Sequence, residues 1–147
     1  MPEMVQDCND AIEVIDFTVI ETIRDKRTQD RYFNSGASHV QWPNSKHNIY
    51  RGRPIAEAMD LWPYIKGIGA ISGHPSQIKA IAINHNLNQD QVKAFVYKAF
   101  ARLAGAVQAV AYTNGHMLRW GGDWDNDGNM LDQNFHDLPH FEFKGDL

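Results

Sequence analysis

The sequence has a single cysteine, Cys8, among its 147 residues, so no intramolecular disulfide can form and nothing points to an oxidising compartment. No apolar run approaches the ~18 residues that a membrane-spanning helix needs. The first ten residues, MPEMVQDCND, contain neither the basic nor the apolar segment of a secretory signal peptide. We therefore expect a chain without a secretory signal and without stable membrane binding.

Positive charge is also scarce. The chain has 14 lysines and arginines against 18 aspartates and glutamates, which gives a formal net charge of -4 at pH 7. A chain of this charge does not attract nucleic acid by long-range electrostatics. Hydrophobic residues make up 43% of the chain, which is enough for an ordinary core, and no repeat or low-complexity linker divides it. We expect a monomer with one domain over residues 1–147.

Local patterns predict a mixture of strands and helices. β-Branched and aromatic residues favour strands, and glycine and proline mark the ends of elements. These patterns predict a weak helix over 9–15, a buried strand over 17–23, a helix over 25–36 ended by Gly36, a loop over 37–54, a strand over 56–64 ended by Pro63, and strands over 116–120 and 140–143. Residues 66–78 carry three glycines and a proline, and no element is predicted there.

The strongest predicted element is a long helix over 89–113. Its apolar residues, from Val92 to Val110, recur at helical spacing and form one stripe. Asn88 and Gln91 have the spacing of a capping box, and Asn114-Gly115 favours a C-terminal end. Few connections are long enough for parallel crossovers, so we predict an α+β fold with a small antiparallel sheet and helices packed around it.

Histidines and acids gather in the stretch HDLPHFEF, residues 136–143. Metal ligands rarely all come from one short segment, so partners are expected elsewhere. His47 lies in the predicted loop, and Asp60 interrupts a strand in which an acid is a poor β-former. Asp60 is therefore either a satisfied buried carboxylate or a metal ligand. Together with His140 these residues would form a two-nitrogen, one-oxygen set with an open fourth position, which is typical of catalytic zinc.

Hydrolysis at such a zinc also needs a carboxylate that takes a proton from water and passes it to the leaving amine. Asp137 lies three positions before His140, and Glu142 lies two positions after it. In an extended strand residues i and i+2 share a face, which favours Glu142. Pro139 breaks the ladder and permits a turn, which favours Asp137. Spacing alone leaves both candidates open.

Four segments of the sequence resemble the M15 family of zinc peptidases. They are ETIRDKRTQ followed by GAS, SKHN with AMDLWPY, RWGGDW, and DLPHFEF, in the family's order across residues 21–143. The resemblance is in particular to small phage endolysins that act as L-alanyl-D-glutamate peptidases, with VanY-like carboxypeptidases as relatives. It implies a hedgehog/DD-peptidase-like fold, Zn²⁺ held by His47, Asp60 and His140, and no separate cell-wall-binding module.

The resemblance also implies roles for three further side chains. Asp137 matches the acid of the family's acid-x-x-His motif and would be the general base. Glu142 would then orient a metal ligand, and Arg24 would steady the oxyanion. Without the resemblance, Arg24 could equally form a surface ion pair with Glu21 or Asp25.

Two departures from the family pattern are visible. The family places its aspartate seven residues after the first histidine, whereas Asp60 follows His47 by thirteen. Residues 48–59 must therefore loop out if His47 is the ligand, and His39 is the alternative first histidine. Residues 65–88 are longer than the family's usual connection, so they are expected to line the substrate groove differently.

An acidic loop, DWDNDGNMLDQN (123–134), predicts a second metal site. Asp123, Asp125, Asp127 and Gly128 occupy positions 1, 3, 5 and 6 of a loop of the EF-hand type. Position 12 is an asparagine rather than the usual glutamate, and Asp132 could compensate. The loop either binds Ca²⁺, which would order the segment leading to Asp137 and His140, or is simply solvated.

The predicted function is a zinc endopeptidase that cuts the L-alanyl-D-glutamate bond of peptidoglycan peptide stems and serves as a phage lysis enzyme. Such an enzyme would stay in the host cytoplasm until lysis and then reach the periplasm and cell wall. The first alternative is a D-alanyl-D-alanine carboxypeptidase or dipeptidase of the same fold, which would normally carry an export signal. The second is a non-catalytic domain stabilised by zinc, although structural zinc sites are normally closed.

Overall fold

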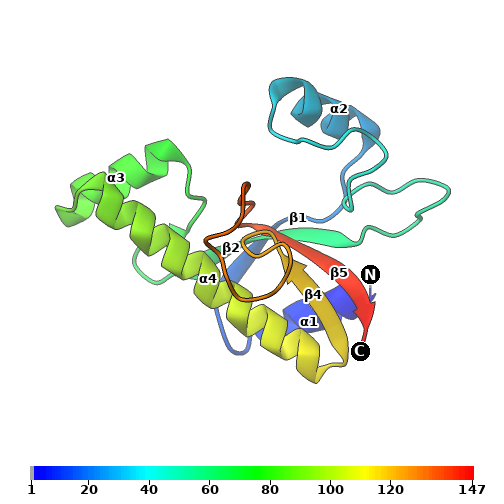
Figure 1. Ribbon diagram of the computed structural model, residues 1–147. Helices are drawn as coiled ribbons and strands as arrows, with labels where there is room; N and C mark the ends of the chain where they lie inside the picture. The colour runs from blue at the N-terminus through cyan, green and yellow to red at the C-terminus, as the bar shows by residue number, and fades with distance from the viewer. Residues whose placement is uncertain (1) are drawn as a thin grey trace.

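The computed structural model describes residues 2–147, and its helices and strands follow one another as labelled in Figure 1. The elements are α1 (Pro2–Ala11), β1 (Phe17–Glu21), α2 (Lys26–Ser35), β2 (Ala58–Ile65), β3 (Gly69–Ala70), α3 (Pro75–His85), α4 (Gln89–Thr113), β4 (His116–Trp120) and β5 (His140–Asp146).

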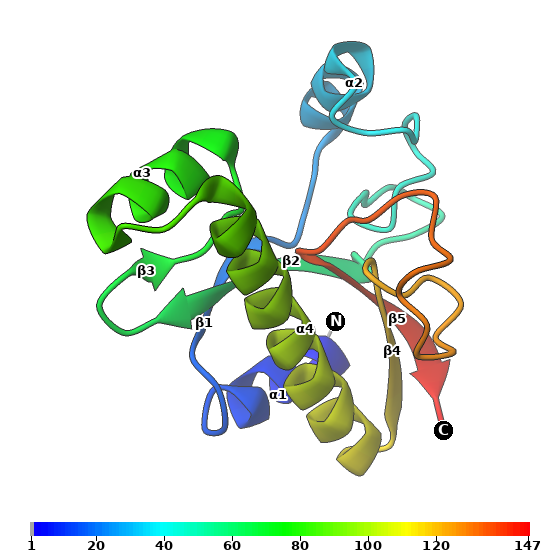
Figure 2. The same cartoon turned by 60° about the vertical axis from the view of Figure 1, so that its left-hand side comes forward.

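The strands form one antiparallel sheet in the order β1-β2-β5-β4, and the short β3 pairs with β2. Helix α4 runs diagonally across one face of this sheet with α1 beside it, whereas α2 stands away from α4 at one end of the sheet (Figures 1 and 2). The predicted α+β class with an antiparallel sheet is therefore confirmed.

The hydrophobic core lies between α4 and the sheet. One face of α4 and the facing strand residues are buried together, including Val92, Val96, Phe100, Leu103 and Val107 from the helix and Met59, Leu61, Leu118, Trp120 and Phe141 from the strands. The predicted capping box at Asn88 and Gln91 is present, and Asn114 caps the C-terminus. Within residues 2–147, no helix has both the length and the apolar content that crossing a membrane requires.

A strand is present where one was predicted over 17–23, but the prediction that it is buried is wrong. Strand β1 ends at Glu21, and Val19 and Ile20 are 47% and 42% exposed. The reason is its place in the sheet. β1 is an edge strand that pairs with β2, outside the area that α4 covers. A β-branched run indicates strand conformation, but it does not report whether a second layer lies above the strand.

Other elements also differ from the predictions. The first helix spans Pro2–Ala11 rather than 9–15, and β2 continues through Pro63 to Ile65. Pro63 has no N–H to donate, but its carbonyl accepts a hydrogen bond from the Ile71 amide at 2.8 Å, so the strand continues. Helix α3 was not predicted. It begins after His74, whose side chain accepts from the Ser76 amide, with Pro75 in its first turn.

The single cysteine is expected to react slowly in the folded protein. Cys8 Sγ lies 3.2 Å from Met59 Sδ, and burial, followed by the Asp7 carboxylate, raises the pKa of the thiol to about 11. Because the thiolate is the nucleophile, alkylation by iodoacetamide near neutral pH should be on the order of a hundredfold slower than in the unfolded chain. Mass spectrometry of timed alkylation with and without denaturant measures this ratio, and equal rates would contradict the prediction.

Candidate metal centre and active-site hollow

Strand alternation places the candidate site on the sheet face opposite α4. In β2 and β5 the side chains of Leu61 and Phe141 enter the core, so their neighbours Asp60, His140 and Glu142 point to the other face. The pairing register sets Asp60 directly opposite His140. This face opens into a hollow of about 720 Å³ that we call the metal-site hollow, lined among others by Arg24, His47, Asp60, Asp137, His140 and Glu142.

Three predicted ligands meet in this hollow. His47 Nε2 and His140 Nδ1 are 3.1 Å apart, and each lies 3.2 Å from Asp60 Oδ1. Zinc ligands with bond lengths of about 2.0–2.1 Å in a tetrahedron are roughly 3.3 Å from one another. The nearly equilateral triangle of donor atoms therefore fits a metal ion such as zinc, with one further position left for a non-protein ligand.

Each histidine of the triangle has an acceptor behind its other ring nitrogen. His47 Nδ1 lies 3.0 Å from the Thr22 carbonyl oxygen, and His140 Nε2 lies 3.6 Å from Glu142 Oε1. The hydrogen bond to Thr22 fixes the tautomer of His47 and leaves Nε2 free to bind a metal, whereas the contact of His140 with Glu142 has the distance of an ion pair. Glu142 also accepts from Arg119 Nη2 at 2.9 Å, so its carboxylate is held near His140 Nε2.

The long connection between His47 and Asp60 does not displace His47. The extra residues turn back on themselves through paired backbone bonds between Tyr50 and Arg53, at 2.8 and 2.9 Å. The alternative histidine, His39, lies in the same hollow, but its ring packs edge-on against Phe135 with centroids 4.9 Å apart. Among residues 2–147, the group of possible ligands at this place contains His47 and not His39.

The electrostatic surroundings favour positive charge at the triangle. Burial alone would lower the pKa of His140, but its bonds to the Asp60 and Glu142 carboxylates raise it to about 9. Burial would raise the pKa of Asp60, yet bonds from the two histidines bring it well below its usual value. Burial likewise opposes ionisation of Glu142, but His140 and Arg119 lower its pKa to about 2. A field that favours a proton on a histidine also favours a metal cation competing for the same nitrogen.

Asp137 reaches the site through a turn that precedes β5. The His140 amide donates to the Asp137 carbonyl at 3.0 Å, which closes the turn over residues 137–140, and the Asp137 amide donates to the Gly121 carbonyl at 2.8 Å. Burial raises the pKa of the Asp137 carboxyl. The charge of His140 lowers it in part, and the charge of Asp60 raises it. The turn thus brings Asp137 to His140, whereas Glu142 reaches the same ring from within β5, two positions after it.

Arg24 is buried in the same hollow rather than on the surface. Its guanidinium Nε donates to Glu21 at 2.9 Å, and Nη2 lies 3.6 Å from Asp60 Oδ2. Asp25, the other expected partner, instead caps α2 by accepting from the Thr28 amide. The ion pair with Glu21 and the position beside the metal site are therefore both present, and the two readings of Arg24 are compatible.

Residues to which the sequence gave no role of their own hold Arg24 in place. Gln29 and Asn48 are fully buried. Gln29 Oε1 accepts from Arg24 Nη1 at 3.1 Å, and Asn48 Nδ2 donates to the Arg24 carbonyl at 3.1 Å. The Tyr32 ring lies 4.8 Å from the Arg24 guanidinium carbon. Gln29 and Asn48 lie in segments that resemble the M15 family, but their contacts with Arg24 are visible only in the packed structure.

The acidic loop is partly assembled as a cation site. One oxygen from each of Asp123, Asp125 and Asp127 lies within 4.8 Å of the others. Asp123 is 8% exposed, its Oδ2 accepts from the Gly128 amide at 2.9 Å, and its Oδ1 is buried without a hydrogen-bond partner among residues 2–147. Asp132 is not in this group, and its Oδ2 accepts a hydrogen bond from Asn129 Nδ2 at 2.9 Å.

Trp124 and Arg119 connect this loop to the metal site. The Trp124 ring lies 5.7 Å from the His140 ring, and the Arg119 guanidinium lies 5.3 Å from the Trp124 ring while it also binds Glu142. A shift of the loop would therefore change the packing around the His140 ring.

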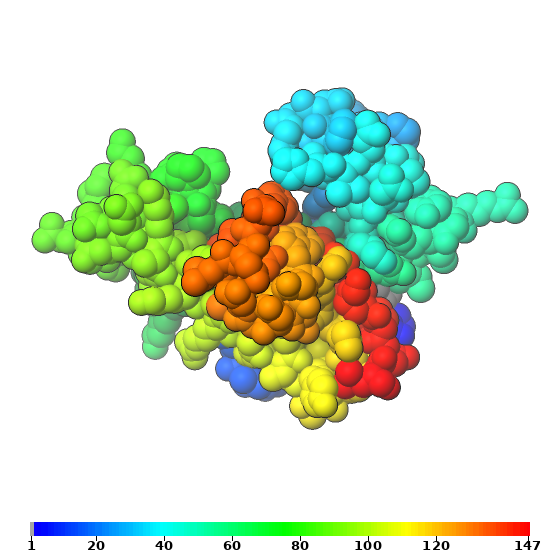
Figure 3. All heavy atoms as spheres, viewed as in Figure 1, coloured from blue at the N-terminus to red at the C-terminus, as the bar shows by residue number. Residues whose placement is uncertain are grey.

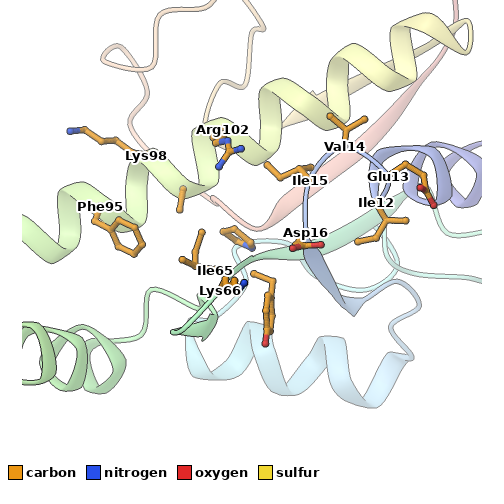
Figure 4. A pocket seen from close by; sticks show the side chains of 13 residues that line it. Ile12, Glu13, Val14, Ile15, Asp16, Ile65, Lys66, Phe95, Lys98 and Arg102 are labelled. Carbon is orange, nitrogen blue, oxygen red and sulfur yellow. The ribbon is translucent and has the colours of Figure 1, made fainter.

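A different hollow of about 520 Å³ lies between the α1–β1 connection, the end of β2 and α4. It is lined by residues such as Ile15, Lys66 and Arg102 (Figure 4). None of the predicted site residues lines it.

The fold of the chain is similar to that of a protein of known structure. Neither the models of protein families nor the curated proteins match the chain. Among solved structures, the chain is similar to the Serratia marcescens L-Ala D-Glu endopeptidase ChiX, with a TM-score of 0.63 and 20% sequence identity. The alignment covers 98% of this chain and 80% of that one. The chain therefore shares the fold of that endopeptidase, as the resemblance predicted.

Proposed function

We propose that the chain is a zinc-dependent peptidoglycan endopeptidase that cleaves the bond between L-alanine and D-glutamate in peptide stems. The observation that carries the proposal is the triangle formed by His47 Nε2, His140 Nδ1 and Asp60 Oδ1 at 3.1–3.2 Å. It occurs in a fold shared with an L-Ala D-Glu endopeptidase. Three protein donors with an open fourth position are typical of catalytic rather than structural zinc.

Zinc bound by these donors would supply Lewis acidity for the scissile carbonyl. Asp137 would accept a proton from the attacking water as the new C–O bond forms, and would return it to the nitrogen as the C–N bond breaks. Asp137 lines the same hollow as the three donors, which places its carboxylate where both proton transfers would occur. Arg24 would donate hydrogen bonds to the oxygen on which negative charge develops.

The bond that is cut can be identified by mass spectrometry of purified peptidoglycan after digestion. The proposal predicts new L-alanine C-termini and new D-glutamate N-termini. Release of free D-alanine without these ends would replace it with the carboxypeptidase alternative. Intact peptidoglycan after incubation with zinc-loaded protein would exclude both peptidases.

A role in phage lysis is a separate part of the proposal, and it is supported by the resemblance of the four sequence segments to phage endolysins. The chain would accumulate in the host cytoplasm and act when the inner membrane is breached. Expression in bacteria tests this directly, because the cells should remain intact until the membrane is permeabilised and should then lyse. If cells that express the Asp137→Ala variant lyse at the same rate as cells that express the wild type, the proposed role is contradicted.

Calcium is expected to raise activity through the acidic loop. The three grouped carboxylates and the unpartnered Asp123 Oδ1 support a Ca²⁺ site. Without the cation the carboxylates repel one another, and groups misplaced by about 1 Å can cost on the order of a hundredfold in rate. The missing twelfth-position glutamate predicts a weak site, roughly micromolar or poorer.

The measurement is activity titrated with calcium in a calcium-selective chelator buffer, with zinc content determined in parallel. Asp125→Ala should flatten the response while zinc content stays unchanged. Asp146→Ala, which removes an exposed acid at the end of β5, is the matched control and should respond as the wild type does. A flat titration for the wild type would show that the loop is a scaffold only.

A further inference from the structure

A second hollow adjoins the metal-site hollow. It has a volume of about 330 Å³ and lies between the start of α3, the first half of α4 and residues 136–139, and we call it the α3–α4 hollow. Asp137 and Pro139 line both hollows, so the turn over 137–140 separates them. In the space-filling view the 121–139 segment rises between the lobes formed by α3 and α2 (Figure 3).

The two hollows differ in charge. The metal-site hollow is rich in charged side chains, with the bases Arg24, Lys46 and Arg119 and the acids Glu21, Asp60, Asp137 and Glu142 in its wall. The basic residue at the α3–α4 hollow is Lys93, whose side chain is 60% exposed and paired with Asp90 at 3.3 Å. The remaining walls of the α3–α4 hollow are largely apolar, from Ile78, Val96, Phe100 and Leu138. Charged ligand groups are therefore favoured in the first hollow and uncharged groups in the second.

Tyr97 gives the α3–α4 hollow an aromatic wall. It is half-buried, and its ring packs edge-on against the His136 ring with centroids 6.1 Å apart and planes at 82°. A contact of this kind restrains the ring. Tyrosine combines an apolar ring with a polar hydroxyl. This combination suits a ligand that presents both C–H surfaces and hydroxyl groups, as a sugar does.

We infer that the α3–α4 hollow is the subsite for the uncharged, sugar-linked end of the substrate, with Tyr97 as its main contact. The inference rests on the proposed function. If Asp137 returns the proton to the leaving nitrogen, the scissile bond lies at Asp137 and the substrate extends to both sides of it. From D-glutamate onward a peptide stem carries free carboxylates, which match the basic side chains Arg24, Lys46 and Arg119 of the metal-site hollow. The preceding L-alanine is joined through a lactyl group to a neutral amino sugar, which matches the α3–α4 hollow.

Binding of N-acetylmuramyl-L-alanine amide tests the subsite without requiring catalysis. Its dissociation constant is measured by NMR chemical-shift titration of zinc-loaded protein. Tyr97→Ala should raise this constant about fivefold, the size expected for loss of one aromatic contact, whereas Tyr97→Phe should keep most of the affinity. Tyr112→Ala is the control, because Tyr112 lies on the same helix, is 69% exposed and is outside both hollows. An equal constant for wild type and Tyr97→Ala would overturn the inference.

Steady-state kinetics with two substrates provide a second test of the subsite. For a stem that carries its disaccharide, Tyr97→Ala should raise KM about fivefold with kcat unchanged, whereas for the free stem peptide KM should not change. A rise of equal size for both substrates would overturn the inference, because the residue would then act through the fold. If the wild type cleaves neither substrate but binds the muramyl amide through Tyr97, the subsite is supported and the proposed function fails instead.

Discussion

Replacing His47 with alanine is expected to eliminate stoichiometric zinc binding and to reduce peptidoglycan hydrolysis to background. His47 supplies one corner of the three-atom triangle and is 1% exposed, so water cannot readily take the place of its nitrogen with the same geometry. Metal content after gel filtration in zinc-free buffer, measured by plasma mass spectrometry, gives the number of zinc ions per chain. The wild type should retain one, in addition to any calcium.

His39→Ala is the matched control for this prediction. His39 lies in the same hollow and, like His47, between α2 and β2, but it packs against Phe135 and is outside the triangle. It should therefore retain zinc. Thermal unfolding provides a second readout, since a ligand at a hundred times its dissociation constant stabilises the folded state by about 2.7 kcal/mol. Zinc should raise the melting temperature of wild type and His39→Ala but not of His47→Ala. The reverse pattern would show that His39 is the ligand.

Asp137→Ala is expected to lower kcat by about two to four orders of magnitude while zinc stays bound, because loss of a general base has a cost of this size. Asp137 lies in the metal-site hollow but outside the triangle of donor atoms. Single-turnover hydrolysis of a defined stem peptide, together with zinc content, separates a catalytic defect from loss of the metal. Asp146→Ala, at an exposed acid in β5, should match the wild type.

Glu142→Ala provides the comparison between the two acids that flank His140. Its removal takes away the carboxylate behind His140 Nε2 and leaves Arg119 without its partner. Zinc affinity should fall about 10- to 100-fold, which is typical for loss of such a supporting group. Excess zinc should then restore most activity to Glu142→Ala but none to Asp137→Ala. If excess zinc rescues Asp137→Ala instead, the two acids have exchanged roles.

Residue type and local spacing were sufficient for several features. The apolar repeat from Val92 to Val110 predicted α4, because helical periodicity is a property of adjacent turns. The capping residue Asn88 was likewise readable, since a cap acts over three positions. An aspartate in a strand and histidines in loops indicated ligands. The predicted α+β class followed from the lengths of the connections.

Other features depend on contacts between distant parts of the chain, and there the sequence was insufficient. β1 has the composition of a buried strand, yet it is exposed because it lies at an edge that no helix covers. Spacing along the chain could not choose between Asp137 and Glu142, and in the structure both approach His140, Asp137 through the turn over 137–140 and Glu142 from within β5. Helix α3 was missed because its glycine-rich approach obscured a short apolar pattern.

For the candidate metal site, too, one part could be predicted from the sequence and another part only from the tertiary structure. The sequence by itself determined which side chains could bind zinc, because ligand chemistry belongs to the residue type. Only the tertiary structure decided that His47 rather than His39 joins Asp60 and His140. That choice depends on the register that sets Asp60 against His140 across 80 positions, and on the turn at Tyr50 and Arg53 that absorbs the extra residues. Register arises from cross-strand hydrogen bonds and core packing, which act between residues that no local pattern connects.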